Sequence, residues 1–297
     1  MVLADEVAEA LRGGRPVVAL ETTLVSHGFS GGRGLAVARA AEDRVRAAGA
    51  VPATVGIVDG TLRAGLGPAE LRRFAEAGSA ARKVGARDIA ACVVQGALGS
   101  TTVGGTLAAC RMAGIRFMAT GGIGGVHRGF AESLDISADL IQIARTPAIV
   151  VCSGAKSMLD VPATAELLET LAVPVLGYRT PTLPLFFTAA GGPPVSAVVV
   201  STAEAARVAS KHWELNPSGG LVLARPPADG LDMTDLITRA VQRVQSAGVT
   251  GQAVTPAVLS LIEELSDGRS VAVNRALIAD NAGLAGEVAV AYAAMAS

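Results

Sequence analysis

Two side chains that could carry acid-base or covalent chemistry each follow closely after a short apolar run. Glu21 directly follows residues 16–20, and Lys156 follows residues 148–152 and a Ser-Gly-Ala turn. A carboxylate there can act as a general acid or base whose pKa is tuned by burial, with a surface or paired glutamate as the alternative. A lysine amine that loses its proton near neutral pH can attack a carbonyl or hemiacetal carbon and form a Schiff base. A lysine that only binds phosphate is the main rival interpretation.

A glycine-rich turn and an acidic segment lie between these two positions. The turn, Ala-Thr-Gly-Gly-Ile-Gly-Gly-Val-His-Arg-Gly, contains His127 and lacks the G-x-G-x-x-G spacing of a dinucleotide site. Downstream, Asp135, Ser137 and Asp139 offer hard oxygen ligands. Such ligands suit Mg²⁺ or Mn²⁺, whereas Zn²⁺ would draw His or Cys. The alternative is a capped helix start.

A lysine and a helix start form a candidate phosphate site. Lys83 precedes a predicted strand, and residues 99–106, Gly-Ser-Thr-Thr-Val-Gly-Gly-Thr, open a predicted helix with backbone N–H groups and hydroxyls. Helix amino termini attract anions, so these residues together could hold a phosphate. Plain N-capping by the Ser and Thr hydroxyls is the alternative. His27 is a weaker candidate for acid-base chemistry.

Short apolar segments alternate with segments of helical periodicity along the chain. The predicted strands cover residues 16–20, 54–58, 89–94, 115–119, 148–152, 173–176 and 221–223. The predicted helices cover residues 4–11, 68–77, 102–113, 163–171, 203–214, 233–247, 256–264 and 271–294, and residues 180–194 form a Pro- and Gly-rich connection. This order predicts one domain over residues 1–297, a three-layer α/β/α fold with a mostly parallel central sheet. The ligand site should then lie beyond the carboxyl ends of the strands.

Composition narrows the class of ligand. The 25 basic and 26 acidic side chains give a net charge of −1 without runs of like charge, which argues against nucleic-acid and membrane partners and for a small molecule. Cys92, Cys110 and Cys152 lack metal-type spacing and are expected to be buried, reduced thiols. The acidic amino terminus lacks the features of a secretory signal, and no apolar run reaches 18 residues, so a cytoplasmic protein is expected.

Five motifs, taken in order, resemble the pseudouridine-5'-phosphate glycosidase family. They are Ala-Leu-Glu-Thr-Thr-Leu-Val-Ser-His-Gly, Gly-Ser-Thr-Thr-Val, the glycine-rich turn quoted above, Asp-Ile-Ser-Ala-Asp-Leu and Gly-Ala-Lys-Ser-Met-Leu-Asp. Weaker matches extend the resemblance over nearly the whole chain. The sequence departs from the family pattern at residues 28–32 and at Gly104-Gly105, which concerns local loop geometry.

The resemblance implies a specific activity. Members cleave the C–C glycosidic bond of pseudouridine 5'-phosphate reversibly, giving uracil and ribose 5-phosphate, as lyases of pseudouridine catabolism. They have an α/β/α fold, depend on Mn²⁺, and are usually homotrimers. We therefore expect one Mn²⁺ per subunit, with Mg²⁺ or another divalent ion as alternatives, and a separate pseudouridine kinase as pathway partner.

The resemblance also assigns roles by motif. Lys156 matches the covalent nucleophile of the family, Glu21 its proton donor and Asp135 its metal ligand. The expected substrate contacts are Lys83, Thr102, Val103, His127, Ser137, Ala138, Asp139 and Asn274. Two other functions remain open from the residues themselves: a Schiff-base aldolase or lyase acting on another sugar phosphate, and a non-catalytic sensor of nucleotides or sugar phosphates.

Overall fold

The computed structural model describes residues 1–29, 32–249 and 254–295. In this part of the chain, eleven strands form one sheet whose main path runs β1-β4-β3-β2-β7-β9-β13-β11-β12, with β6 beside β3 and β5 beside β6. The strands are β1 (Val2–Leu3), β2 (Val17–Leu20), β3 (Val51–Val58), β4 (Thr61–Ala64), β5 (Arg82–Val84), β6 (Gly99–Thr101), β7 (Phe117–Ala119), β9 (Ile149–Cys152), β11 (Val175–Tyr178), β12 (Ala197–Val199) and β13 (Leu221–Ala224). A separate antiparallel pair joins β8 (Val126–His127) to β10 (Leu159–Asp160).

The central part of the sheet is parallel, as predicted. From β3 through β2, β7, β9, β13 and β11 to β12, every neighbouring pair runs in the same direction. The antiparallel pairs are β3 with β4 and β3 with β6, at one end of the sheet. The carboxyl ends of the central strands therefore meet at one edge of the sheet.

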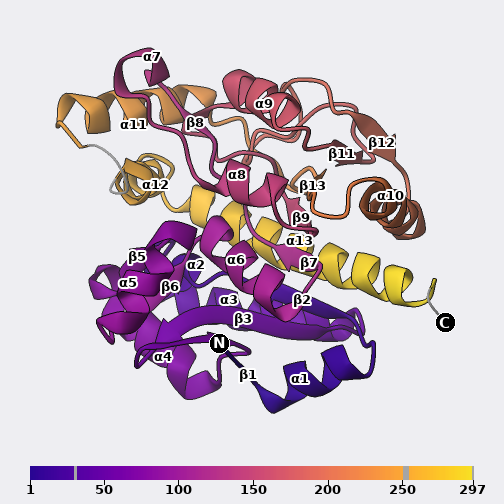
Figure 1. Ribbon diagram of the computed structural model, residues 1–297. Helices are drawn as coiled ribbons and strands as arrows, with labels where there is room; N and C mark the ends of the chain where they lie inside the picture. Colours follow the sequence, from indigo (N-terminus) through magenta and orange to yellow (C-terminus); the bar gives the residue numbers. More distant parts are fainter. Residues whose placement is uncertain (30–31, 250–253, 296–297) are drawn as a thin grey trace.

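Helices cover both faces of this sheet (Figure 1). They are α1 (Asp5–Arg12), α2 (Thr23–Ser26), α3 (Gly34–Ala47), α4 (Pro68–Ala77), α5 (Ile89–Val94), α6 (Val103–Ala113), α7 (Phe130–Ser133), α8 (Asp139–Ala144), α9 (Val161–Thr170), α10 (Thr202–Leu215), α11 (Thr234–Ser246), α12 (Val254–Leu265) and α13 (Arg269–Ala293). Helix α13 packs with α3 and α10 and contacts β2, β7 and β9, while α6 packs with α8 in front of the sheet in this view. The predicted three-layer α/β/α fold is confirmed.

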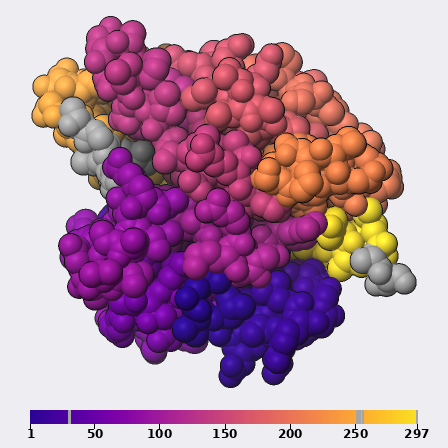
Figure 2. Space-filling model, in the orientation of Figure 1, coloured from indigo at the N-terminus to yellow at the C-terminus, as the bar shows by residue number. Residues whose placement is uncertain are grey.

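The core is aliphatic because both faces of the sheet are covered. Every residue of β2, β3, β9 and β13 is buried, which explains why these strands are continuous apolar runs rather than alternating ones. The last helix, α13, is also deeply buried along most of its length. On the face drawn in Figure 2, α13 reaches the surface only near its carboxyl end.

One predicted strand is wrong and some elements were not predicted. Residues 89–94, Ile-Ala-Ala-Cys-Val-Val, form helix α5, in which Cys92 is buried and Val94 is 86% exposed. A short apolar run does not distinguish a strand from a helix turn by its period. Here a 3-10 turn, Ala86–Asp88, leads directly into the helix, and the Asp88 carboxylate accepts from the Gly85 N–H. Helix α3 and strands β4 and β6 were not among the predicted elements.

The cysteines lie where the sequence predicted. All three are free and buried, and burial raises the pKa of the Cys110 and Cys152 thiols to about 12. These two thiols therefore stay protonated and unreactive. Among the residues that the structure describes, no helix combines the length and the apolar character that crossing a membrane requires.

Candidate active site

The residues that follow three adjacent parallel strands line one cavity. Glu21 follows β2, Thr120 follows β7, and Lys156 follows β9 after a short turn; these strands are neighbours in the order β2-β7-β9. With Lys83 and Asn274 they line a cavity that we name the Glu21 chamber. The site therefore lies at the carboxyl edge of the sheet, as expected for an open parallel sheet.

The Glu21 carboxylate is buried and held by two hydroxyl groups. Its side chain is only 4% exposed, and Thr23 Oγ1 donates a hydrogen bond to Oε2 while Thr120 Oγ1 donates to Oε1. Hydrogen bonds to an ionised carboxylate are stronger than neutral ones and fix its orientation. The carboxylate is thus set in one position at the wall of the chamber.

A second cavity joins the Glu21 chamber at the two lysines. This Asp135 chamber, about 330 Å³ in volume, is large enough for a sugar phosphate. Its lining includes Thr102, His127, Asp135, Ser137, Ala138 and Asp139. Lys83, Lys156 and Thr23 line both chambers, so the amines lie where the cavities meet. Of the residues expected to form the site, Val103 alone lines neither chamber, because its side chain is fully buried.

The surroundings of Lys83 lower its pKa. Burial lowers the pKa of Lys83, and the nearby positive charge of Lys156 lowers it further. Three carboxylates, those of Asp139, Glu21 and Asp135, act in the opposite direction without reversing the shift. Burial and the neighbouring Lys156 charge therefore disfavour the charged form of Lys83.

Asp139 joins two backbone segments that border the Asp135 chamber. Its Oδ1 accepts from the Gly104 N–H at 2.7 Å, and its Oδ2 accepts from the Gly124 N–H at 3.0 Å. The Gly105 N–H is also taken, by the Thr102 Oγ1 cap at 3.2 Å. The expectation of free amides at the start of α6 is therefore wrong for these two glycines, because local carboxylate and hydroxyl acceptors already occupy them. Asp139 fixes the walls of the cavity.

Asp135 and His127 face each other beside the lysines. His127 Nδ1 lies 3.9 Å from Asp135 Oδ2, and burial lowers the pKa of His127 despite the attraction of this carboxylate. No group of three or more His, Cys, Asp or Glu side chains suited to a metal occurs in the described ranges. The donors present fit an ion held by one carboxylate and otherwise by water, as Mg²⁺ and Mn²⁺ accept.

The loops after β7 and β9 are paired beyond the ends of the strands. Ser153 N–H donates to Gly121 O at 2.9 Å, Ile123 N–H to Gly154 O at 3.0 Å, and Lys156 N–H to Ile123 O at 3.1 Å. Gly154 has φ +85°, and a Cβ there would stand 2.0 Å from Pro184 O. Glycine is therefore required for the turn that carries Lys156.

Two further residues complete the Glu21 chamber from distant parts of the chain. Asn274, on α13, is 7% exposed, and its Oδ1 has no hydrogen-bond partner among the described residues, so it is available to a ligand. Phe186 lines the same chamber with φ +64°, an uncommon conformation for a bulky side chain. Sequence reasoning missed Phe186 because its segment, residues 180–194, has no periodicity that places a side chain.

The fold and the site define an α/β/α protein with a lysine and carboxylate cavity for a small anionic ligand. Residues 6–291 match the family described as Indigoidine synthase A like protein, and the chain belongs to this family. Pseudouridine-5'-phosphate glycosidase of Chloroflexus aurantiacus is 47% identical, with 97% of each chain covered. The protein of the same name from Sorangium cellulosum is 45% identical, over 97% of this chain and 92% of its own length. The family resemblance seen in the sequence is confirmed.

Solved structures share the fold over nearly the whole chain. The prealnumycin C-glycosynthase AlnA in complex with ribulose 5-phosphate aligns with a TM-score of 0.90 and 40% identity, covering 99% of this chain and 97% of that one. An indigoidine synthase A-like protein from Thermotoga maritima aligns with a TM-score of 0.86 and 36% identity, covering 93% of each chain.

Proposed function

We propose that this protein cleaves the C–C glycosidic bond of pseudouridine 5'-phosphate to uracil and ribose 5-phosphate, through a Schiff base on Lys156. The observation that carries the proposal is the meeting of Lys156 and Glu21 in one chamber, with Lys83 and Lys156 also lining a second chamber sized for a sugar phosphate. The names of the relatives and of AlnA, which concern C-glycosides and a pentose phosphate, support the same chemistry.

The proposed first step opens the sugar. The neutral Lys156 amine attacks C1', the bond from C1' to the ring oxygen breaks, and the Glu21 carboxylate takes the proton that the amine nitrogen loses and passes it to that oxygen. Two hydroxyl donors hold the Glu21 carboxyl group in place for this transfer. A carbon-linked base is a poor leaving group, so direct hydrolysis by two carboxylates is ill suited to this bond.

The second half of the reaction releases the base. A proton from solvent water is added to the base carbon, the C–C bond breaks with the nitrogen lone pair of Lys156 forming a protonated C=N bond, and uracil leaves; that proton returns to solvent when the imine is hydrolysed. Water then hydrolyses the ribose-lysine imine, which frees ribose 5-phosphate and restores the amine. Lys83, which lines both chambers, offers an amine to bind the phosphate.

The remaining residues bind and orient. Thr102 borders the Asp135 chamber, where we place the phosphate together with Lys83. Asp135 would hold a divalent cation, Mn²⁺ in our proposal, which supplies electrostatic stabilisation to oxygen atoms of water or substrate. Asn274, whose Oδ1 has no hydrogen-bond partner among the described residues, would bond the polar edge of a uracil ring.

The test is a trapping experiment on the purified protein. It is incubated with pseudouridine 5'-phosphate, Mn²⁺ and borohydride, and mass spectrometry is used to detect free uracil and a reduced pentose phosphate adduct on Lys156. Lys156→Ala should abolish both products. Lys83→Ala should still form the adduct on Lys156 but should bind the substrate more weakly. An adduct on Lys83 would overturn the assignment of the nucleophile. Trapping with other sugar phosphates but without uracil release would favour an aldolase, and binding without any turnover would favour a sensor.

A further inference from the structure

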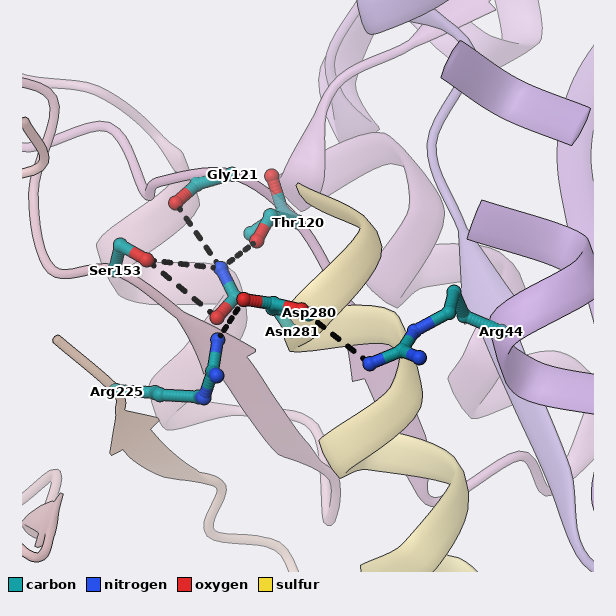
Figure 3. A network of polar contacts seen from close by, with 7 residues as sticks. All are labelled: Arg44, Thr120, Gly121, Ser153, Arg225, Asp280 and Asn281. Atoms are coloured by element: carbon teal, nitrogen blue, oxygen red, sulfur yellow. Dashed lines mark hydrogen bonds and ion pairs between the residues drawn. The ribbon is translucent and has the colours of Figure 1, made fainter. Parts of the chain in front are cut away.

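Asn281 lies at the point where the two catalytic loops meet the buried helix α13 (Figure 3). Its side chain is fully buried. The Nδ2 group donates to Thr120 O at 2.9 Å, in the loop after β7, and to Ser153 Oγ at 3.1 Å, in the loop after β9. A carbonyl oxygen can only accept, so the amide nitrogen must face these loops.

Each of these two contacts leads to a residue of the proposed mechanism. The Thr120 whose carbonyl Asn281 holds is the residue whose hydroxyl donates to Glu21. Ser153 begins the turn that ends at Lys156, and its N–H is bonded to Gly121 in the neighbouring loop. One amide group therefore contacts both the segment that orients the acid and the segment that carries the nucleophile.

We propose that Asn281 is a positioning residue, which sets the distance between Glu21 and Lys156 by holding the loops after β7 and β9 against α13. The inference rests on the proposed function. One buried amide bonds both loops, because its Nδ2 group donates to Thr120 O and to Ser153 Oγ. Alanine has no donor, and serine is too short to bond both loops. Reactions that depend on the relative placement of two groups lose rate steeply when that placement drifts.

The next residue on the helix provides a matched control. Asp280 forms ion pairs with Arg225 at 2.8 Å and with Arg44, on α3, at 3.3 Å. These contacts anchor the same turn of α13 without touching Thr120 or Ser153. Asp280→Ala therefore loosens the helix, whereas Asn281→Ala releases the loops.

The test compares these variants with the wild type in the uracil-release assay. We expect Asn281→Ala to lower kcat roughly 10- to 100-fold, as removal of supporting residues around a site does. KM should stay within roughly threefold, because the phosphate contacts are untouched. Asp280→Ala should keep kcat within about twofold, since partly exposed ion pairs contribute little. In the double variant Asn281→Ala with Thr120→Val, the fold-loss in kcat should be smaller than the product of the two single-variant losses, because both changes act on Glu21.

Hydrogen exchange gives a readout that needs no turnover. In Asn281→Ala, the bonded amides of Ile123, Ser153 and Lys156 should exchange faster than in Asp280→Ala. If Asn281→Ala does not fold, Asn281→Ser keeps a polar side chain at this position and is measured in its place. Unchanged kcat, unchanged exchange, or equal losses in the two alanine variants would overturn the inference. A wild type that releases no uracil would refute the proposed function instead, with the exchange data still deciding the placement.

Discussion

The carboxylate of Asp139 should be worth several kcal/mol to the folded protein, and its removal offers a quantitative prediction. Its two oxygens each accept one backbone N–H, from Gly104 and Gly124, and the side chain is 5% exposed. Asp139→Asn keeps one acceptor and turns an NH₂ toward the other amide. Losing one hydrogen bond to a buried charge costs about 1.5–3 kcal/mol. Asp139→Ala loses both and should cost about 3–6 kcal/mol by the same reasoning.

The assay is urea unfolding followed by circular dichroism, with the free energy of unfolding compared between variants. Asp160→Asn is the control, because Asp160 accepts only one N–H, from Ala163 at 3.0 Å, as the N-cap of α9. Asparagine caps a helix about as well as aspartate, so this control substitution should change the free energy of unfolding little. The reasoning is refuted if Asp139→Asn unfolds within about 0.5 kcal/mol of the wild type, or if Asp139→Ala is no less stable than Asp139→Asn.

Three further predictions concern charge, metal and backbone. Because the pKa of Lys83 is lowered on folding, the unfolded chain binds this proton more readily, and stability rises with pH between the folded and unfolded pKa values. Lys83→Met should therefore raise Tm at neutral pH, flatten that alkaline rise and increase KM; a lower Tm would contradict it. Asp135→Ala should remove the response of activity to added Mn²⁺ and leave Tm nearly unchanged, and retention of full metal-dependent activity would refute the ligand role. Gly154→Ala should cost more than the roughly 1–3 kcal/mol of backbone strain, because its Cβ would meet Pro184 O at 2.0 Å, and should abolish uracil release. Gly114→Ala is the control, because Gly114 also has a positive φ but an added Cβ there would meet no atom within 4 Å. It should lower Tm less than Gly154→Ala does.

Much of the site could be predicted because its residues are local to strand ends. Glu21 and Lys156 each follow an apolar run, and in a parallel sheet such positions come together at one edge. Lys83 and Asp135 were predicted from their motifs, not from strand ends; Lys83 lies within β5, and both residues line the second chamber. The prediction of a strand over residues 89–94 was wrong, because the period of a six-residue apolar run does not distinguish a strand from a helix. The preceding turn leads this segment into a helix.

The sequence by itself determined the layered α/β class, the motifs and the family, because apolar periodicity and local residue order are properties of the chain. Only the tertiary structure decided which groups remain available. It showed that the amides of Gly104 and Gly105 are already bonded, that Phe186 lines the chamber, and that Asn281 joins two loops more than 120 residues before it on the chain. Such contacts depend on how α13 packs behind the sheet, and no local pattern encodes the distance between segments so far apart.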